Sequence, residues 1–376
     1  MPGLAAVFFA GVKALYRVFY GKNDSKSMFI FWMLCARFKI GVSEKRESGE
    51  SLTMEEKTSR SRHLVDPEIV SAIDLIPTTN LTASTLMESR KNQAQMMRQL
   101  DVTQMFPVTL EEKAVPSYFG GPDIRIEIIK PIQPKHPKMP LYYSIHGGGM
   151  VLGSPAGDRP GNAALAAQHG FCCVSVYYRL APEHVQPSQL QDCYSGLKWC
   201  IDHAEELGID TQKVALGGSS AGGGLAAGLA LYIRDRKEFE VHHLRLLRPM
   251  LDDRTSIGPE HPYAGEFVWT KQSNYFGWKS VLGHEPGLEE VSEYYVPARA
   301  TSLAGLPPTY INIGTIDLFI DEALLFAKQL VFDGVLTELH VYPGYHHLSP
   351  MFPDAHFSRE GAESSEYALL KALDLL

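Results

Sequence analysis

Strand-like and helix-like segments alternate along this 376-residue chain from about residue 115 onward, and this alternation limits its fold more than any other feature. Parallel strands joined by helices need right-handed crossovers, so the pattern predicts an α/β fold with a mostly parallel central sheet and helices on both faces. We expect the first strand, residues 124–132, at an edge. The other predicted strands are 140–149, 171–180, 213–218, 243–251, 308–314 and 337–344. The predicted helices in this part are 188–207, 221–236, 322–332 and 366–376.

Ligands of such sheets bind at the carboxyl ends of the strands, so we expect the functional residues in the turns that follow them. One of them, residues 218–222, reads Gly-Ser-Ser-Ala-Gly and fits the pattern G-x-S-x-G. The frame selects Ser220, because a pattern centred on Ser219 would need glycine where Ala221 stands. A strand before the turn and a helix after it would lift the Ser220 hydroxyl above the sheet as a nucleophile. The alternative is a glycine-rich helix start with structural serines.

A second strand end carries three glycines, in the sequence Ile-His-Gly-Gly-Gly-Met at 145–150. Glycines after a buried strand let backbone N–H groups point into a cavity. A phosphate loop would need a lysine at a fixed spacing that is absent here. We therefore predict an oxyanion hole formed by the amides of Gly148, Gly149 and Ala221, and we expect His146 to brace the loop.

Two later strand ends supply a carboxylate and an imidazole. Asp317 follows one predicted strand, and His346 and His347 follow the last one. The order Ser, Asp, His is that of a hydrolase triad in which histidine takes the serine proton and aspartate orients the histidine. The alternatives are helix capping for Asp317, for which Asp321 is the better candidate, and a surface position for His347.

Five motifs together resemble the hormone-sensitive-lipase-like branch of the α/β-hydrolases. They are HGGG at 146–149, YRLAPEH at 178–184, GSSAGG at 218–223, DLFIDE at 317–322 and GYHH at 344–347. The resemblance covers about residues 64–376, and its spacing from Gly344 selects His347 as the triad base. It implies an α/β-hydrolase fold with a helical cap over residues 63–105, a catalytic domain over 106–376 and carboxylesterase activity.

The chain departs from this family at positions that bear on substrate preference. Ser219 replaces an aspartate beside the nucleophile, Gly224 replaces a polar residue, and Leu348 and Ser349 replace a Gly-Phe pair. The aromatic segment 265–283 is similar to an insertion that lines the acyl or alcohol pocket. Ordinary aromatic packing explains its composition equally well.

Residues 1–62 form an N-terminal extension without a counterpart in the family core. It contains two apolar segments, 3–20 and 28–35, and a charged linker from 43 to 63. Neither segment reaches the roughly 20 apolar residues that span a bilayer. Amphipathic helices packed on the body and a peripheral membrane contact through residues 1–40 are both consistent with them. The five cysteines are an odd number, and Cys172 and Cys173 lie in an apolar run that is typical of buried thiols, so a reducing compartment is the simpler interpretation. We expect a cytoplasmic protein that can associate with a membrane through the extension.

Several function classes are excluded by charge and by missing motifs. The net charge of −8 disfavours nucleic acid as a partner. No metal or cofactor motif appears, so we expect neither. The sequence predicts a serine carboxylic-ester hydrolase that uses an acyl-enzyme on a small or medium apolar ester. A transacylase, a lactonase or a deacetylase would use the same nucleophile, and a non-catalytic small-molecule receptor is an alternative of another class.

Overall fold

The computed structural model describes residues 59–73, 80–97, 101–347, 352 and 355–376. Eight strands form one sheet in the order β1-β2-β4-β3-β5-β6-β7-β8. The strands are β1 Val108–Val115, β2 Ile124–Pro131, β3 Met139–Ile145, β4 Cys172–Tyr177, β5 Ile209–Ser219, β6 His243–Leu247, β7 Thr309–Gly314 and β8 Thr337–Tyr342. All neighbouring pairs from β4 to β8 are parallel, which confirms the predicted fold class.

The prediction that residues 124–132 form an edge strand is wrong. β2 pairs antiparallel with β4 on one side and with β1 on the other, in a hairpin that aligns Val108 with Pro131 and Val115 with Ile124. Strand β1 forms the edge. Its sequence VTLEEKAV places charged residues in the middle of the strand, so it lacks the apolar run that marks central strands such as β3 and β4.

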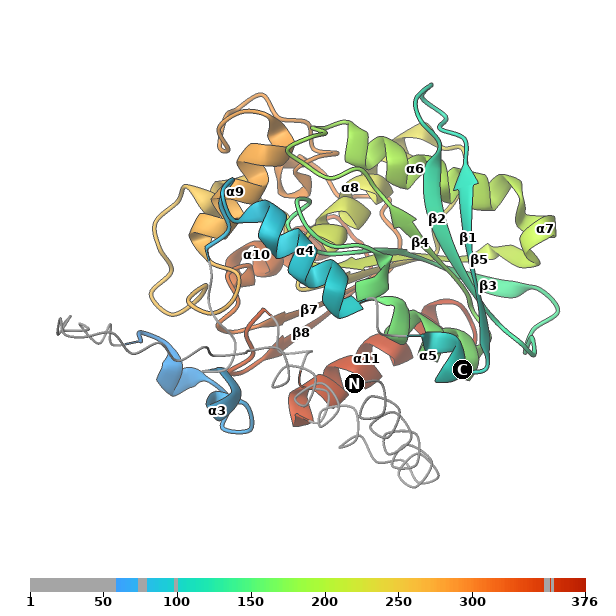
Figure 1. Cartoon of the computed structure of the whole chain (residues 1–376), viewed down its shortest axis with the longest axis horizontal. Helices are drawn as coiled ribbons and strands as arrows, with labels where there is room; N and C mark the ends of the chain where they lie inside the picture. The colour runs from blue at the N-terminus through green and yellow to red at the C-terminus, as the bar shows by residue number, and fades with distance from the viewer. Residues whose placement is uncertain (1–58, 74–79, 98–100, 348–351, 353–354) are drawn as a thin grey trace, which may run out of the picture.

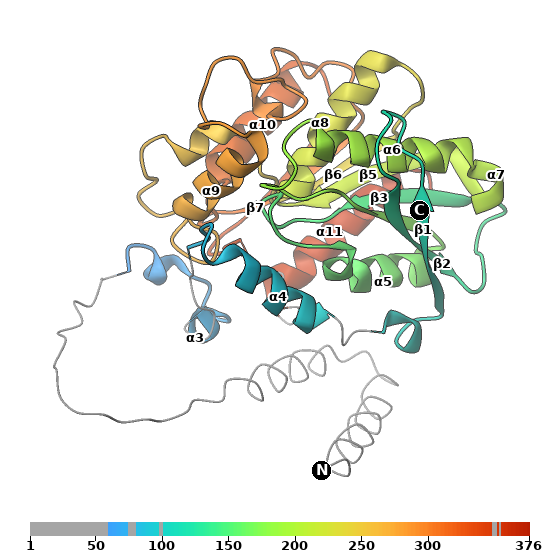
Figure 2. The same ribbon diagram turned by 45° about the horizontal axis from the view of Figure 1, so that its top comes forward.

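Helices cover both faces of the sheet (Figures 1 and 2). On one face lie α5 Arg159–His169 and α11 His356–Ala372, and on the other lie α6 Ser188–Asp202, α8 Ala221–Arg236 and α10 Ile320–Phe332. The remaining helices are α3 Val70–Ile73, α4 Leu86–Met97, α7 Ala204–Leu207 and α9 Lys271–Leu282. Short 3-10 turns are η1 Arg62–Leu64, η2 Val102–Gln104, η3 Pro155–Gly157, η4 Asp253–Ser256 and η5 Pro297–Arg299.

Each helical layer has its own hydrophobic core. The larger cluster joins α6, α8 and α10 to the sheet, and the smaller one joins α5 and α11 to the opposite face. Strand β3 is buried along its whole length between the two, which explains its uninterrupted apolar sequence. Helix α11 begins ten residues before the predicted start at 366, because its first turns are rich in serine, glycine and charge and carry no clear apolar period.

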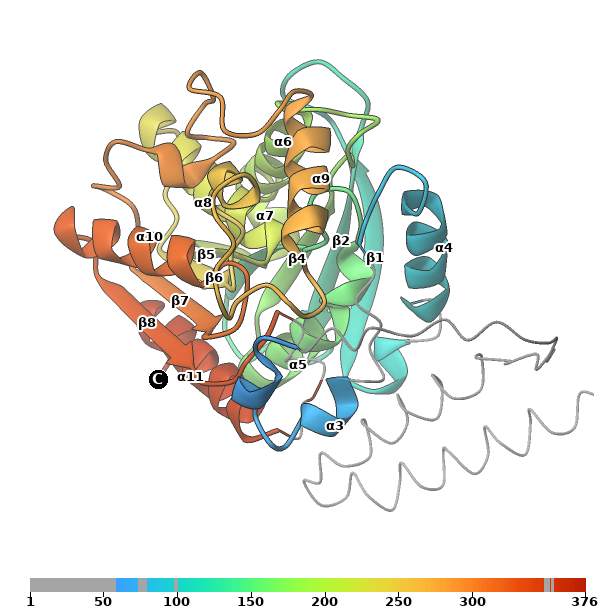
Figure 3. The ribbon, with the colours of Figure 1, turned by 90° about the vertical axis from the view of Figure 1, so that its left-hand side faces the viewer.

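The helix α4 lies outside these layers, over the carboxyl ends of the central strands (Figures 1 and 3). It is the main helix of the predicted cap. The described residues before it hold the 3-10 turn η1 and the single turn α3, which lies near the start of α11, where the amide of His356 donates to Glu68 Oε2 at 2.7 Å (Figure 3). Asp66 caps the turn α3, since its Oδ1 accepts the amide of Glu68 at 2.8 Å and its carbonyl accepts the amide of Val70 at 3.1 Å.

The predicted boundary at residue 62 falls inside packed structure. Ser61 is fully buried, and its amide and hydroxyl both donate to Glu266 Oε2, at 2.8 and 2.6 Å. Packed structure therefore includes Ser61, which lies inside the range predicted for the charged linker. The two apolar segments at 3–20 and 28–35 lie outside the described residues. Within the part that is described, no helix has the length and apolarity needed to cross a bilayer.

Candidate active site

Ser220 stands on a sharp turn between β5 and α8. Its φ of 57° is strained for a residue with a side chain, and such strain is typical of a nucleophile held above a sheet. The turn is fixed by its backbone, since the Ser220 amide donates to Leu247 O and its carbonyl accepts from Met250 N, at 2.9 and 3.0 Å. Gly222 is required, because a Cβ there would lie 1.9 Å from Ile145 O.

The imidazole of His347 joins Ser220 to Asp317. His347 Nε2 lies 2.8 Å from Ser220 Oγ, and its Nδ1 lies 2.8 Å from Asp317 Oδ2. The three residues come from the ends of β5, β7 and β8, and they are 7%, 5% and 1% exposed for Ser220, His347 and Asp317. With the ring proton on Nδ1, that N–H donates to Asp317 and the Ser220 hydroxyl donates to Nε2. In this arrangement His347 can receive the serine proton.

The second carboxylate oxygen of Asp317 is also occupied. Asp317 Oδ1 accepts the backbone amide of Phe319 at 3.0 Å, which fixes the carboxylate in the plane that His347 uses. The expectation that Asp321 caps the following helix is wrong. Helix α10 begins at Ile320, so Asp321 lies inside its first turn, and Asp317 makes the amide contact at this end.

The two adjacent histidines have different surroundings. His346 is fully buried, and its ring lies against the aromatic rings of Phe267 and Phe352 rather than toward Ser220. Burial lowers the pKa of His346 to about 4, despite the opposing effect of Asp317. His347 therefore occupies the position that the spacing from Gly344 predicts.

Three unoccupied amides lie near the nucleophile. The backbone N–H groups of Gly148, Gly149 and Ala221 donate to no acceptor within the described residues. Gly148 and Gly149 have φ values of 116° and 62°, which turn the chain after β3, and Ala221 is the first residue of α8. Ala221 directly follows Ser220, and a Cβ on Gly147 would lie 3.2 Å from Ser220 Cβ, so the turn with Gly148 runs beside Ser220. Free amide donors next to a serine are what an oxyanion requires.

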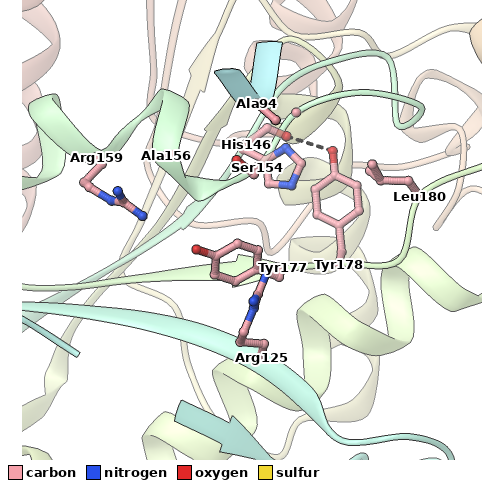
Figure 4. A pocket seen from close by; sticks show the side chains of 10 residues that line it. Ala94, Arg125, His146, Ser154, Ala156, Arg159, Tyr177, Tyr178 and Leu180 are labelled. Carbon is pink, nitrogen blue, oxygen red and sulfur yellow. Dashed lines mark hydrogen bonds between the residues drawn. The ribbon is translucent and has the colours of Figure 1, made fainter. Parts of the chain in front are cut away.

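His146 braces the glycine turn. Its Nδ1 lies 2.8 Å from Gly147 O, and its ring stacks on Tyr178, with ring centroids 4.1 Å apart. The Tyr178 hydroxyl in turn donates to His146 O at 2.9 Å, as the dashed line in Figure 4 shows. Burial lowers the pKa of His146 to about 4, so its ring is neutral near pH 7. The expectation of a structural role for His146 agrees with these contacts.

Comparisons with known proteins agree with this geometry. A family with the alpha/beta hydrolase fold matches residues 142–351. The chain belongs to the α/β-hydrolase fold family. Esterase LipI of Mycobacterium tuberculosis is 27% identical over 294 residues, which are 76% of this chain and 88% of that protein. Carboxylesterase NlhH of Mycobacterium tuberculosis is 29% identical over 303 residues, 77% of this chain and 92% of NlhH.

Comparison with solved structures also finds similarity to esterases. A bacterial heroin esterase is 35% identical with a TM-score of 0.77, and the match covers 83% of this chain and 98% of that one. Esterase LipW from Mycobacterium marinum is 30% identical with a TM-score of 0.74, over 83% of this chain and 96% of that one. The resemblance to the hormone-sensitive-lipase-like branch is thereby confirmed.

In this α/β-hydrolase, the aromatic segment 265–283 is divided between two roles. Trp269 lies beside the site, with its ring centroid 6.4 Å from that of His347 and its indole filling the space next to Gly149. Phe319 presents its edge to His347, with centroids 5.1 Å apart. Trp278, by contrast, is fully buried in the large core. Trp269 therefore lies beside the triad together with Phe319, which is outside the segment, whereas Trp278 packs as an ordinary core aromatic.

A buried carboxyl braces the loop after β6. Glu322 Oε2 accepts the amides of Leu251, at 3.2 Å, and of Asp252. Burial raises the pKa of Glu322 well above its usual value, and Asp252 raises it further. Asp253 pairs with Arg299 and Asp252 pairs with Arg254, both at 2.8 Å, so the two acidic residues of this loop have structural contacts.

A pocket of about 450 Å³ lies beside the glycine turn of the hydrolase (Figure 4). The rings of His146, Tyr177 and Tyr178 and the side chain of Arg159 face it, and Ala94 of α4 contributes to its rim. Its lining includes none of Ser220, Asp317 and His347. The contacts of His347 with Ser220 and Asp317 therefore lie outside this pocket.

No group of three or more potential metal ligands occurs in the residues that the structure describes. Sequence reasoning missed one set of contacts, those of Arg90 and Gln93 on α4 with the turn after β3. These contacts join residues about 60 positions apart, and neither residue belongs to a motif. No local signal could have indicated them.

Proposed function

We propose that this protein is a serine carboxylic-ester hydrolase that acts through an acyl-enzyme. The observation that carries the proposal is the imidazole of His347, which lies 2.8 Å from both Ser220 Oγ and Asp317 Oδ2. The names of the related proteins, esterase and carboxylesterase, support the same reaction class. The chemistry needs no cofactor.

In the acylation step, Ser220 Oγ attacks the ester carbonyl carbon while His347 Nε2 takes the hydroxyl proton. The carbonyl oxygen becomes an oxyanion, which accepts hydrogen bonds from the amides of Gly148, Gly149 and Ala221. Collapse of the tetrahedral intermediate breaks the bond to the alkoxy oxygen. His347 then gives its proton to the departing alcohol, and the acyl group remains on Ser220.

In the deacylation step, water takes the place of the alcohol. His347 removes a proton from that water, the hydroxide attacks the acyl carbon, and the same amides stabilise the second oxyanion. The proton returns to Ser220 Oγ as the carboxylic acid leaves. Asp317 stabilises the imidazolium in both steps and holds the ring tautomer.

We propose a small or medium apolar ester as the substrate. The rings of Trp269 and Phe319 next to His347 support this class, because they offer apolar contact area at the reacting carbonyl. p-Nitrophenyl acetate, butyrate, octanoate and palmitate form a suitable series. We expect the highest kcat/KM with acetate or butyrate, whereas a maximum with palmitate would contradict the proposed chain length.

The reaction class is tested by a fluorophosphonate probe on the purified full chain, followed by peptide mapping. We expect one labelled serine, Ser220, no label in a Ser220→Ala variant, and strongly reduced label in a His347→Ala variant. Label on another residue would refute the assignment of the nucleophile. A folded protein that takes no label and hydrolyses no ester in the series would favour the receptor alternative.

The acyl acceptor is tested separately. Because an acyl-enzyme can pass its acyl group to an alcohol as well as to water, added methanol, glycerol or longer alcohols compete with hydrolysis. A transacylase would form the new ester faster than the free acid at low alcohol concentration. We expect free acid as the main product.

The N-terminal extension has its own test. Peripheral membrane contact through residues 1–40 predicts that the full chain binds liposomes and that a chain lacking residues 1–58 does not. The shorter chain keeps the contacts of Ser61 with Glu266, so its esterase activity should be unchanged. Equal binding of the two chains would refute the membrane contact.

A further inference from the structure

We infer that the cap helix α4 positions the oxyanion hole, with Arg90 and Gln93 as the positioning residues. This inference rests on the proposed function. Helix α4 of the cap is connected to the turn 148–153 that follows β3. The side chains of α4 reach the backbone of that turn on both sides of one residue, Leu152.

Arg90 makes the first contact. Its Nε donates to Val151 O at 2.8 Å, and its Nη2 donates to Ala181 O at 2.7 Å. Its two terminal nitrogens also donate to the carboxylate of Glu183, at 2.7 and 2.9 Å. The planar guanidinium therefore joins α4 to the glycine turn and to the segment 178–184 at once, which a lysine could not do.

Gln93 makes the second contact, one helical turn further along α4. Its Oε1 accepts the amide of Gly153 at 2.9 Å. The two side chains thus hold the carbonyl before Leu152 and the amide after it. The carbonyl of Val151 and the amide of Gly153 have no hydrogen-bond partner in a strand or helix, and the side chains of the cap provide one for each.

Leu152 passes this restraint to the oxyanion loop. Its amide donates to Gly148 O at 2.8 Å, and its carbonyl lies so close to Gly148 that a Cβ there would be 2.3 Å from Leu152 O. A shift of Leu152 therefore moves Gly148. The φ of Gly148 is 116°, and the contact with Leu152 holds the residue in this conformation. The direction of the Gly148 N–H, a proposed oxyanion donor, therefore depends on Leu152.

The described side chains of α4 attach it to the body mainly through polar contacts. Among the side chains of α4 that the structure describes, only Leu86 is buried, whereas Arg90 and Gln93 are half-buried and most others are exposed. A helix held mainly by such hydrogen bonds can leave the body and return at modest cost. When it leaves, the turn 151–153 loses its two restraints and the hole loses its fixed geometry.

This arrangement predicts an effect on the transition state rather than on substrate binding. An oxyanion donor acts mainly after charge has developed on the carbonyl oxygen, so its displacement lowers kcat and leaves KM nearly unchanged. Loss of a whole donor costs about 10²–10³ in kcat in other enzymes. We expect about a tenfold loss of kcat for partial displacement of the Gly148 amide.

The test compares two substitutions at one position. Gln93→Met keeps the length of the side chain but removes the acceptor, whereas Gln93→Glu keeps an oxygen that can accept the Gly153 amide. We expect kcat for p-nitrophenyl butyrate to fall about tenfold in Gln93→Met, with KM changed less than twofold, and to recover in Gln93→Glu. Phosphonylation of Ser220 should slow in parallel, since the phosphonyl oxygen uses the same amides.

Arg90→Lys gives an independent variant, because it keeps the charge opposite Glu183 but cannot serve both carbonyls. We expect a fall in kcat at least as large as that of Gln93→Met. Lys91→Ala, an exposed position on the same helix, is the matched control and should behave as the wild type.

Unchanged kcat in both Gln93→Met and Arg90→Lys would overturn the inference, as would a change in KM alone. Failure of the proposed function itself would look different, because the wild-type protein would then neither hydrolyse the ester nor take the probe.

Discussion

Replacement of Asp317 by asparagine tests the roles of His347 and Asp317 most sharply. Asp317 is buried, and its two oxygens have different partners, the Phe319 amide at Oδ1 and His347 Nδ1 at Oδ2. In Asp317→Asn, the single amide oxygen must accept the Phe319 N–H, because a backbone donor cannot face the NH₂ group. The NH₂ group then faces His347 Nδ1.

That orientation inverts the tautomer of His347. An NH₂ donor at 2.8 Å requires Nδ1 to be the acceptor, so the ring proton moves to Nε2. An Nε2 that carries a proton cannot take one from Ser220. In other serine hydrolases this substitution lowers kcat about 10⁴-fold, which equals about 5 kcal/mol of transition-state stabilisation. We expect the same magnitude here.

The assay is kcat for p-nitrophenyl butyrate at pH 7.5, with circular dichroism and thermal unfolding to verify the fold. Ser220→Ala measures the residual rate without a nucleophile. Asp317→Ala is the matched control, since it removes the carboxylate without imposing either tautomer on the ring of His347. We expect Asp317→Asn to be no more active than Asp317→Ala. More than a tenth of wild-type kcat in Asp317→Asn would refute the reasoning.

Two further predictions concern stability. Gly222→Ala would place a methyl group 1.9 Å from Ile145 O, so we expect a loss of about 1–3 kcal/mol or more in denaturant unfolding, together with lower kcat. Gly161→Ala in α5, where a Cβ meets nothing within 4 Å, should instead gain about 0.5–1 kcal/mol. His243→Leu tests acid sensitivity, because burial lowers the pKa of His243 to about 4 from 6.5. Between pH 6.5 and pH 4 the unfolded chain binds a proton at His243, whereas the folded protein does not. The free energy of unfolding of the wild type should therefore fall by up to about 3 kcal/mol relative to His243→Leu as the pH is lowered over that range. The exposed His284→Leu should show no such difference, and parallel pH profiles for wild type and His243→Leu would contradict the prediction.

Most of the fold could be predicted because the local pattern of a buried parallel strand is strong. Strands β3, β4 and β7 and the second half of β5 are continuous apolar runs between helical segments, so their positions can be read from the sequence. Strand β1 was missed because charged residues occupy its centre, and an edge strand needs little buried surface. The order of the strands could not be predicted, because hydrophobic periodicity does not say which strand is the neighbour.

For the candidate site, too, single residues could be predicted from the sequence, but their contacts could not. The frame of residues 218–222 selects Ser220, and the resemblance to the family, through its spacing from Gly344, selects His347. The second contact of Asp317, with the Phe319 amide, could not be predicted, since it depends on where α10 begins. The division of segment 265–283 between the site and the core was equally hidden, because Trp269 and Trp278 are chemically alike.

The sequence by itself determined the fold class and which residue types stand at the ends of the strands, because backbone propensity and hydrophobic periodicity are local properties. Only the tertiary structure decided that α4 reaches the glycine turn, that Arg90 and Gln93 bracket Leu152, and that three strand ends bring Ser220, Asp317 and His347 within 2.8 Å contacts. The physical reason is that these contacts join residues between 30 and 127 positions apart. Their geometry is set by sheet order and helix packing, which no short stretch of the chain encodes.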